Sequence, residues 1–132
     1  MTFRHAGVMR LLRESGLFVS VQLSGGKVRA LLSETRFLDI HFDPTSRSYS
    51  YALIDLTLPY PGDKRILGWD DYPHPGALEL AKLASTPHHF QERLPGGSWL
   101  FIESTFRGDI EHELPSVLVT VRTICVGSGS GQ

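Results

Sequence analysis

The sequence predicts an α+β fold, in which an antiparallel meander sheet of five to six strands packs against an N-terminal and a C-terminal helix. Apolar residues alternate with polar ones through most of residues 17–69, which is the period of a strand. At both ends of the chain they instead recur every three or four residues, which is the period of a helix. Short connections separate the strand-like runs, so strands adjacent in sequence should pair antiparallel.

The first helix and hairpin are expected within residues 8–32. Val8, Leu11 and Leu12 have helical spacing, and Gly16 can end that helix in a left-handed conformation. Two alternating runs follow, at 17–23 and 27–32. Gly25 and Gly26 lie between them and supply the positive φ angles that a tight hairpin turn requires.

Three more strands are expected before residue 70. Runs at 38–43 and 49–53 form a second hairpin around a turn at 44–47. A proline-containing loop at 55–64 leads to a fifth strand at 65–69.

The second half of the chain is less regular. A short helix is expected at 77–84 and a sixth strand at 98–104. The segment 109–125 has a helical apolar stripe, with acidic residues at its start that suit a helix N-terminus. Pro115 and the alternation of valines from 117 to 121 leave a strand open, and we favour the helix. Residues 1–126 then form one domain, and the Gly- and Ser-rich residues 127–132 form a flexible tail.

Composition favours a cytoplasmic globular protein. The chain has 132 residues, of which 41% are hydrophobic, and it contains one cysteine, so no internal disulfide can form. No apolar run approaches the roughly 18 residues of a membrane span, and no secretory signal is recognisable. The net charge of −1 excludes a strongly basic nucleic-acid binder, so any RNA contact would be local.

Candidate catalytic residues gather between Trp69 and Phe90. His74, His88 and His89 lie there, beside two aspartates and several prolines. An imidazole titrates near neutral pH, and a neighbouring carboxylate can orient it. Phosphate-cradling glycine loops, dinucleotide fingerprints and serine-hydrolase elbows are absent from the sequence, which leaves acid–base chemistry, metal chemistry or binding.

Three interpretations of this segment remain open on the residues alone. In the first, His74 and one of His88 or His89 act as base and acid on an RNA phosphodiester, while Arg65 or Arg47 holds the phosphate. In the second, His74, one of those histidines and an aspartate bind a divalent metal, although the spacing matches no standard zinc pattern. In the third, the histidines only make local hydrogen bonds.

The same segment resembles the TumE-like proteins, which are toxin components of prokaryotic toxin–antitoxin pairs. The resemblance lies in Tyr49-Ser50-Tyr51, in Trp69-Asp70-Asp71-Tyr72-Pro73-His74-Pro75 and in Pro87-His88-His89. It covers roughly residues 37–90. The chain departs from the pattern at Asp71, where the family tends to have Asn, at Pro75, where a second His would fall, and at Phe90-Gln91. The resemblance implies a small cytoplasmic protein that acts on RNA or translation and is neutralised by a cognate antitoxin.

We therefore predict a TumE-like toxin that acts as a ribonuclease without a cofactor. His74 and His88 would be base and acid, with Asp70 orienting an imidazole. The expected substrate-binding residues are Arg65, His89, Tyr49, Tyr51 and Trp69. A divalent metal at His74, His88 and Asp70 is the alternative for the chemistry. The alternative function is a non-catalytic protein whose sheet and histidine loop contact a partner protein or a second copy in a homodimer.

Overall fold

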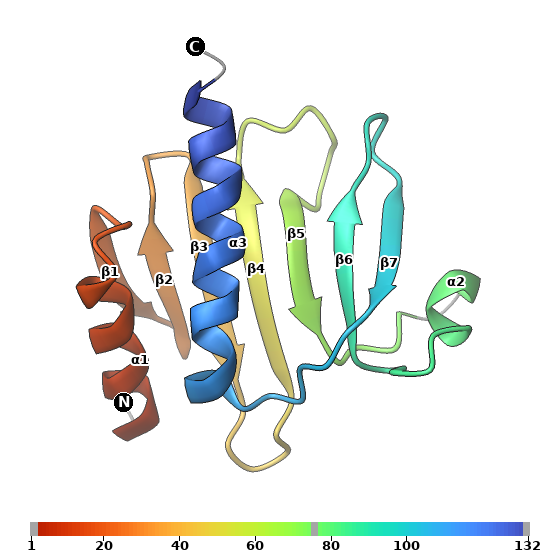
Figure 1. Cartoon of the computed structure of the whole chain (residues 1–132), viewed down its shortest axis with the longest axis horizontal. Helices are drawn as coiled ribbons and strands as arrows, with labels where there is room; N and C mark the ends of the chain where they lie inside the picture. The colour runs from red at the N-terminus through yellow and green to blue at the C-terminus, as the bar shows by residue number, and fades with distance from the viewer. Residues whose placement is uncertain (1–2, 75–76, 131–132) are drawn as a thin grey trace.

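The computed structural model describes residues 3–74 and 77–130, and it contains one antiparallel sheet of seven strands in sequence order (Figure 1). Helices lie at both ends of the chain, so the predicted α+β meander is confirmed. The strands are β1 (Ser20–Ser24), β2 (Lys27–Leu31), β3 (Arg36–Phe42), β4 (Tyr49–Asp55), β5 (Arg65–Asp70), β6 (His89–Arg93) and β7 (Trp99–Glu103).

The two long helices, α1 (Phe3–Glu14) and α3 (Ile110–Ser130), lie on one side of the sheet, in front of β1 to β4 (Figure 1). We call this the helix side. The core lies between the two layers and is built from the apolar residues of α1, α3 and β2 to β5. A short helix, α2 (Leu78–Ala81), lies beyond β7 at the far end of the sheet. No helix in the described part of the chain is both long and apolar enough to cross a membrane.

The C-terminal segment is a helix, as favoured. Its residues 110, 114, 117 and 121 are buried, whereas Val119 is 63% exposed. Only the helical period puts Val119 outside while Val117 and Val121 are inside. Pro115 lies in the second turn, where it removes a single backbone hydrogen bond. The helix continues to Ser130, into the segment 127–132 that is expected to be a flexible tail, and residues 131–132 lie outside the described part.

The strand count differs from the prediction because β6 was missed. The segment His89–Arg93 has strand periodicity, but His89 and Gln91 are the residues that it buries on one face. A search for alternating apolar residues does not detect buried polar ones. The predicted helix at 77–84 is also shorter in the structure, where it is the single turn α2. Pro75 and Gly76 lie outside the described residues.

The sheet face opposite the helices carries the candidate site, and we call it the open face. Its residues can be read from the pairing register, since directly paired residues point to the same side. Asp39 pairs with Ala52, Ala52 with Gly68, Gly68 with Gln91, and Asp70 with His89.

Candidate functional site

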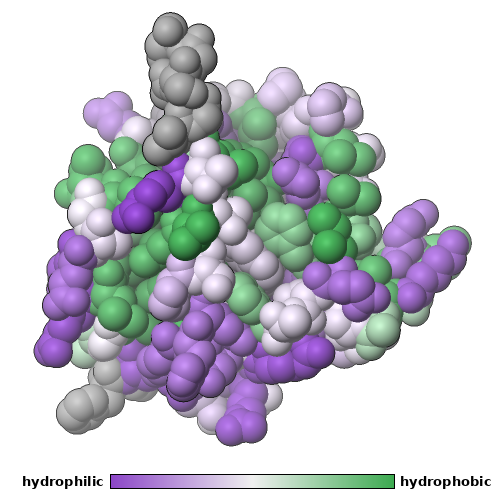
Figure 2. All heavy atoms as spheres, viewed as in Figure 1, coloured by the Kyte–Doolittle hydropathy of each residue, from purple (hydrophilic) through white to green (hydrophobic). Residues whose placement is uncertain are grey.

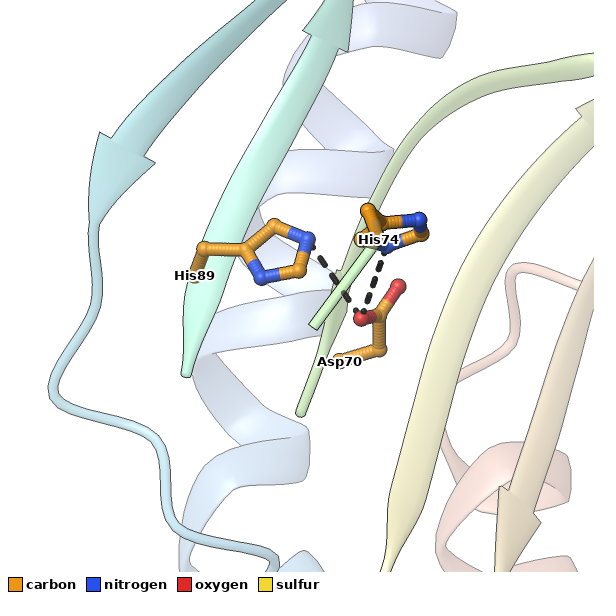
Figure 3. A group of neighbouring side chains, drawn as sticks. All are labelled: Asp70, His74 and His89. Atoms are coloured by element: carbon orange, nitrogen blue, oxygen red, sulfur yellow. Dashed lines mark hydrogen bonds and ion pairs between the residues drawn. The ribbon is translucent and has the colours of Figure 1, made fainter. Parts of the chain in front are cut away.

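Asp70, His74 and His89 meet on the open face, where β5 ends and β6 begins (Figure 3). Asp70 is the last residue of β5 and pairs directly with His89, the first residue of β6. His74 follows β5 by four residues, and its backbone has φ 45°, a left-handed value that is uncommon outside glycine. Backbone strain of this kind is often found at functional sites. We call these three residues the His–Asp cluster.

One carboxylate oxygen is the centre of the cluster. Oδ1 of Asp70 lies 3.3 Å from Nε2 of His74 and 3.3 Å from Nε2 of His89. It also accepts a hydrogen bond of 2.9 Å from the backbone N–H of Tyr72. Charge-assisted hydrogen bonds are normally about 2.7–2.9 Å long, so the two contacts to imidazole are loose.

The tautomer of His89 follows from its other nitrogen. Nδ1 lies 2.9 Å from the carbonyl oxygen of Pro87, which can only accept, so Nδ1 carries the proton. In the neutral ring Nε2 then presents a lone pair. Nε2 also lies 2.8 Å from Oε1 of Gln91, and rotation of that amide would place its NH2 group there as a donor.

Only one member of the cluster is accessible to a substrate. Asp70 is 1% exposed and His89 is 0% exposed, whereas the side chain of His74 is 26% exposed. The ring of Phe101 packs edge-on against His89 with centroids 5.5 Å apart. His89 can therefore orient or bind something at Asp70, but in this conformation it cannot touch a substrate from solvent.

Arg65 is held beside the cluster. Its Nη1 lies 3.5 Å from Oδ2 of Asp70, and its other nitrogens donate to Asp63 at 2.6–3.0 Å. Burial alone would lower the pKa of Arg65, but the Asp63 hydrogen bonds and charge raise it. The guanidinium also lies over the ring of Trp99, 5.4 Å from its centroid. It is a fixed positive charge at the edge of the site.

The cluster has the geometry of a metal-ligand set. Ligand atoms bonded at about 2.0–2.1 Å to one tetrahedral ion lie about 3.3–3.4 Å from each other. Two of the three separations in the cluster match this value, and all three donor atoms lie within 4.8 Å of one another. The contact from His89 Nδ1–H to a backbone carbonyl is the second contact that metal-binding histidines usually make.

His88 lies away from the cluster. Its Nδ1 is 3.0 Å from the hydroxyl of Tyr49, a helix-side residue, and the two rings stack. Burial and the charge of Arg107 lower the pKa of His88. The structure therefore does not bring His74 and His88 together, either as the predicted acid–base pair or as metal ligands. His89 is the second histidine of the site.

The three aromatic residues expected to bind substrate lie in the helix-side core. Tyr49 and Tyr51 are fully buried and Trp69 is nearly so. Tyr51 donates a 2.8 Å hydrogen bond to Glu113 on α3, and Trp69 stacks on Phe106. These rings belong to the hydrophobic core and are not available to bind substrate in this structure.

Gln91 is a site residue that the sequence reasoning missed. It lies next to His89 on the same face of β6 and is 1% exposed. The sequence signal for Gln91 is its spacing of two residues from both His89 and Arg93. In a strand this spacing places the three residues on one face, so the signal depends on recognising β6 as a strand.

Comparison with protein-family models, with curated proteins and with solved structures finds no match to this chain.

Proposed function

We propose that the chain is a TumE-like toxin that cleaves RNA, and that its reaction depends on a divalent transition-metal ion bound by Asp70, His74 and His89. The observation that supports this most is the convergence of two imidazole nitrogens on one buried carboxylate oxygen at 3.3 Å. A set of two histidines and one carboxylate leaves coordination positions for water or substrate, as catalytic metal sites do.

The burial pattern assigns a role to each member. Asp70 and His89 are inaccessible, so they would hold the ion, while the partly exposed His74 would complete the site on the solvent side. An ion held by these residues would supply a Lewis acid that polarises a phosphoryl oxygen. Arg65 would hold the phosphate beside it.

The reaction that fits RNA needs no nucleophilic side chain. The 2′-oxygen forms a bond to phosphorus, and the bond from phosphorus to the 5′-oxygen breaks. The proton of the 2′-hydroxyl passes to solvent water, and the leaving 5′-oxygen takes a proton from solvent water. The products are a 2′,3′-cyclic phosphate and a 5′-hydroxyl.

The test is RNA cleavage by the purified chain, with and without added Zn²⁺ or Mn²⁺ after treatment with chelator. We expect cleavage only with metal, and a loss of at least about a hundredfold in His89→Ala, since changing even the residues that orient metal ligands commonly costs 10- to 100-fold. His112→Ala is the matched control, because His112 is an exposed histidine on α3. Expression of the wild type should also arrest growth, and His74→Ala should not. Intact RNA under every condition would contradict the proposal.

A metal-free reaction is the second candidate. His74 is accessible and its Nε2 contacts Asp70, so the pair can accept a proton from a 2′-hydroxyl without an ion. Undiminished cleavage in excess chelator, lost in both His74→Ala and Asp70→Asn, would favour this mechanism. Growth arrest without RNA cleavage would instead favour the non-catalytic binding function.

A further inference from the structure

A hollow of about 210 Å³ lies on the open face next to the His–Asp cluster. We call it the open-face hollow, and Lys27, Asp39, His41, Ala52, Arg65 and Tyr72 line it. Arg65 and Tyr72 connect it to the cluster, because Arg65 contacts Asp70 and the ring edge of Tyr72 packs against His74 with centroids 6.4 Å apart. Whatever occupies the hollow therefore lies beside the accessible histidine.

Small residues in the central strands leave this space open. Ala52 on β4 lies in the floor and pairs with Gly68 on β5. A Cβ added at Gly68 would lie 2.8 Å from the backbone oxygen of Tyr51, so the approach of β4 and β5 requires glycine there. A hollow of this size is smaller than the roughly 300–1,000 Å³ of pockets for drug-sized ligands, so it suits a single ring system.

One polar atom of a residue that lines the hollow has no partner in the described part of the chain: Nδ1 of His41 is buried without a hydrogen bond. Ser50 lines the same hollow and adds a hydroxyl group. Buried polar atoms are normally satisfied, so an unpaired one beside a cavity suggests a ligand. Asp39 is different, because Arg29 holds both of its oxygens at 2.8 and 3.0 Å and fixes the carboxylate in the wall.

The rim adds an aromatic ring and two cations. Tyr72 is 45% exposed, and Lys27 on β2 and Arg65 on β5 both line the hollow. An exposed aromatic ring stacks on a base, and cations follow the phosphate backbone; together they are the usual means of binding single-stranded nucleic acid.

We infer that the open-face hollow binds one nucleobase of a single-stranded RNA, next to the phosphate that is cleaved. This inference rests on the proposed function, and it names the part of the RNA substrate that the hollow recognises. Tyr72 stacks on the base, and His41 and Ser50 bond its edge. Arg65 and Lys27 hold the flanking phosphates.

The test is the binding of labelled 2′-O-methyl pentanucleotides of A, C, G or U to the full chain, measured by fluorescence anisotropy with and without Zn²⁺. The methyl groups block attack by the 2′-oxygen, so binding is measured without cleavage. We expect one base to be preferred, Tyr72→Ala to weaken binding about tenfold, and Ala52→Leu to abolish the preference by filling the floor. Lys27→Ala should reduce the slope of log K against log salt by about 0.7. Leu100→Ala is the matched control, since Leu100 is 43% exposed on the helix side.

The outcomes separate this inference from the proposed function. Base-selective binding that depends on Tyr72, with no cleavage of ordinary RNA, supports the hollow and contradicts the proposed function. Cleavage with equal affinity for all four oligonucleotides in the wild type and in Tyr72→Ala overturns the hollow and leaves the proposed function standing. Absence of binding in the wild type also overturns it. Circular-dichroism melting of each variant establishes that it is folded. Because Tyr72 is exposed, Tyr72→Ala should disturb the fold less than Ala52→Leu does.

Discussion

At the scale of single residues, Asp70 has the most demanding position in the site. It is 1% exposed, and its Oδ1 is the acceptor for a backbone N–H and the neighbour of two imidazoles. A buried carboxylate is costly unless its neighbours compensate it, so these groups must stabilise it together. The same arrangement suits a cation, which would replace two loose contacts by short ones.

Replacing Asp70 therefore has two separable effects. Asp70→Ala leaves the Tyr72 N–H without its acceptor, and should lower the free energy of unfolding by about 1–3 kcal/mol in urea denaturation. Asp70→Asn keeps an acceptor oxygen and should cost less. Both variants should lose the rise in melting temperature that Zn²⁺ is expected to give the wild type. An unchanged rise in either variant would show that the ion binds elsewhere.

The lowered pKa of His88 predicts that the stability of the fold depends on pH. Its pKa lies below the usual value of about 6.5, because burial and Arg107 oppose its protonation in the folded state. As the pH falls below about 6.5, the unfolded chain takes up this proton first, so the folded state loses stability until the folded pKa is reached. His88→Gln, whose amide can donate the same bond to Tyr49, should lose less stability than the wild type between pH 7 and pH 5. Urea denaturation across this range would show it.

His112 is the control for that measurement, because its shift has the opposite sign. The hydrogen bond and charge of Asp109 raise its pKa. Its stabilising effect is thus present at low pH and is lost as the pH rises through the folded value. His112→Gln should not reduce the loss of stability on acidification, and equal pH profiles for His88→Gln and the wild type would contradict the assignment.

At the scale of elements, the sequence predicted six of the seven strands and both terminal helices, because recurring apolar residues mark these segments. It placed His89 in a loop because β6 buries polar side chains on the open face. Periodicity alone also could not decide which of two adjacent histidines faces His74. Alternation in a strand sends them to opposite faces, so that choice depended on finding β6 and its register with β5.

Substitution of Gly68 by alanine tests how closely β4 and β5 approach each other, and the same substitution at Gly7 is its control. A Cβ at Gly68 would lie 2.8 Å from a backbone oxygen of β4, so Gly68→Ala should destabilise the fold by about 1–3 kcal/mol. Gly7 lies inside α1 with nothing within 4 Å of an added Cβ. Gly7→Ala should therefore stabilise the fold by about 0.5–1 kcal/mol through helix propensity. Equal effects in urea denaturation would contradict the close packing of β4 against β5.

At the scale of the whole molecule, the two halves of the sheet are covered differently. Helices α1 and α3 lie in front of β1 to β4, while no helix formed by the described residues lies in front of β5 to β7 (Figure 1). Hydrophobic side chains are visible on that part of the helix side (Figure 2), and Leu100 and Ile102 of β7 are exposed there. The second half therefore has fewer apolar contacts to lose when it opens.

The His–Asp cluster joins strands of that less covered half, and this predicts where a bound ion acts. Amide hydrogens of β6 and β7 should exchange faster than those of β3 and β4, because local opening of this half exposes less apolar surface. A Zn²⁺ ion held by the proposed site would bind only the closed arrangement of Asp70 and His89, so it should slow exchange in β5 and β6 and leave β2 and β3 unchanged. His89→Ala should abolish this protection, and His112→Ala should retain it. Protection spread equally over all strands would mean that the ion stabilises the fold globally, and protection that survives in His89→Ala would remove the cluster as its binding site.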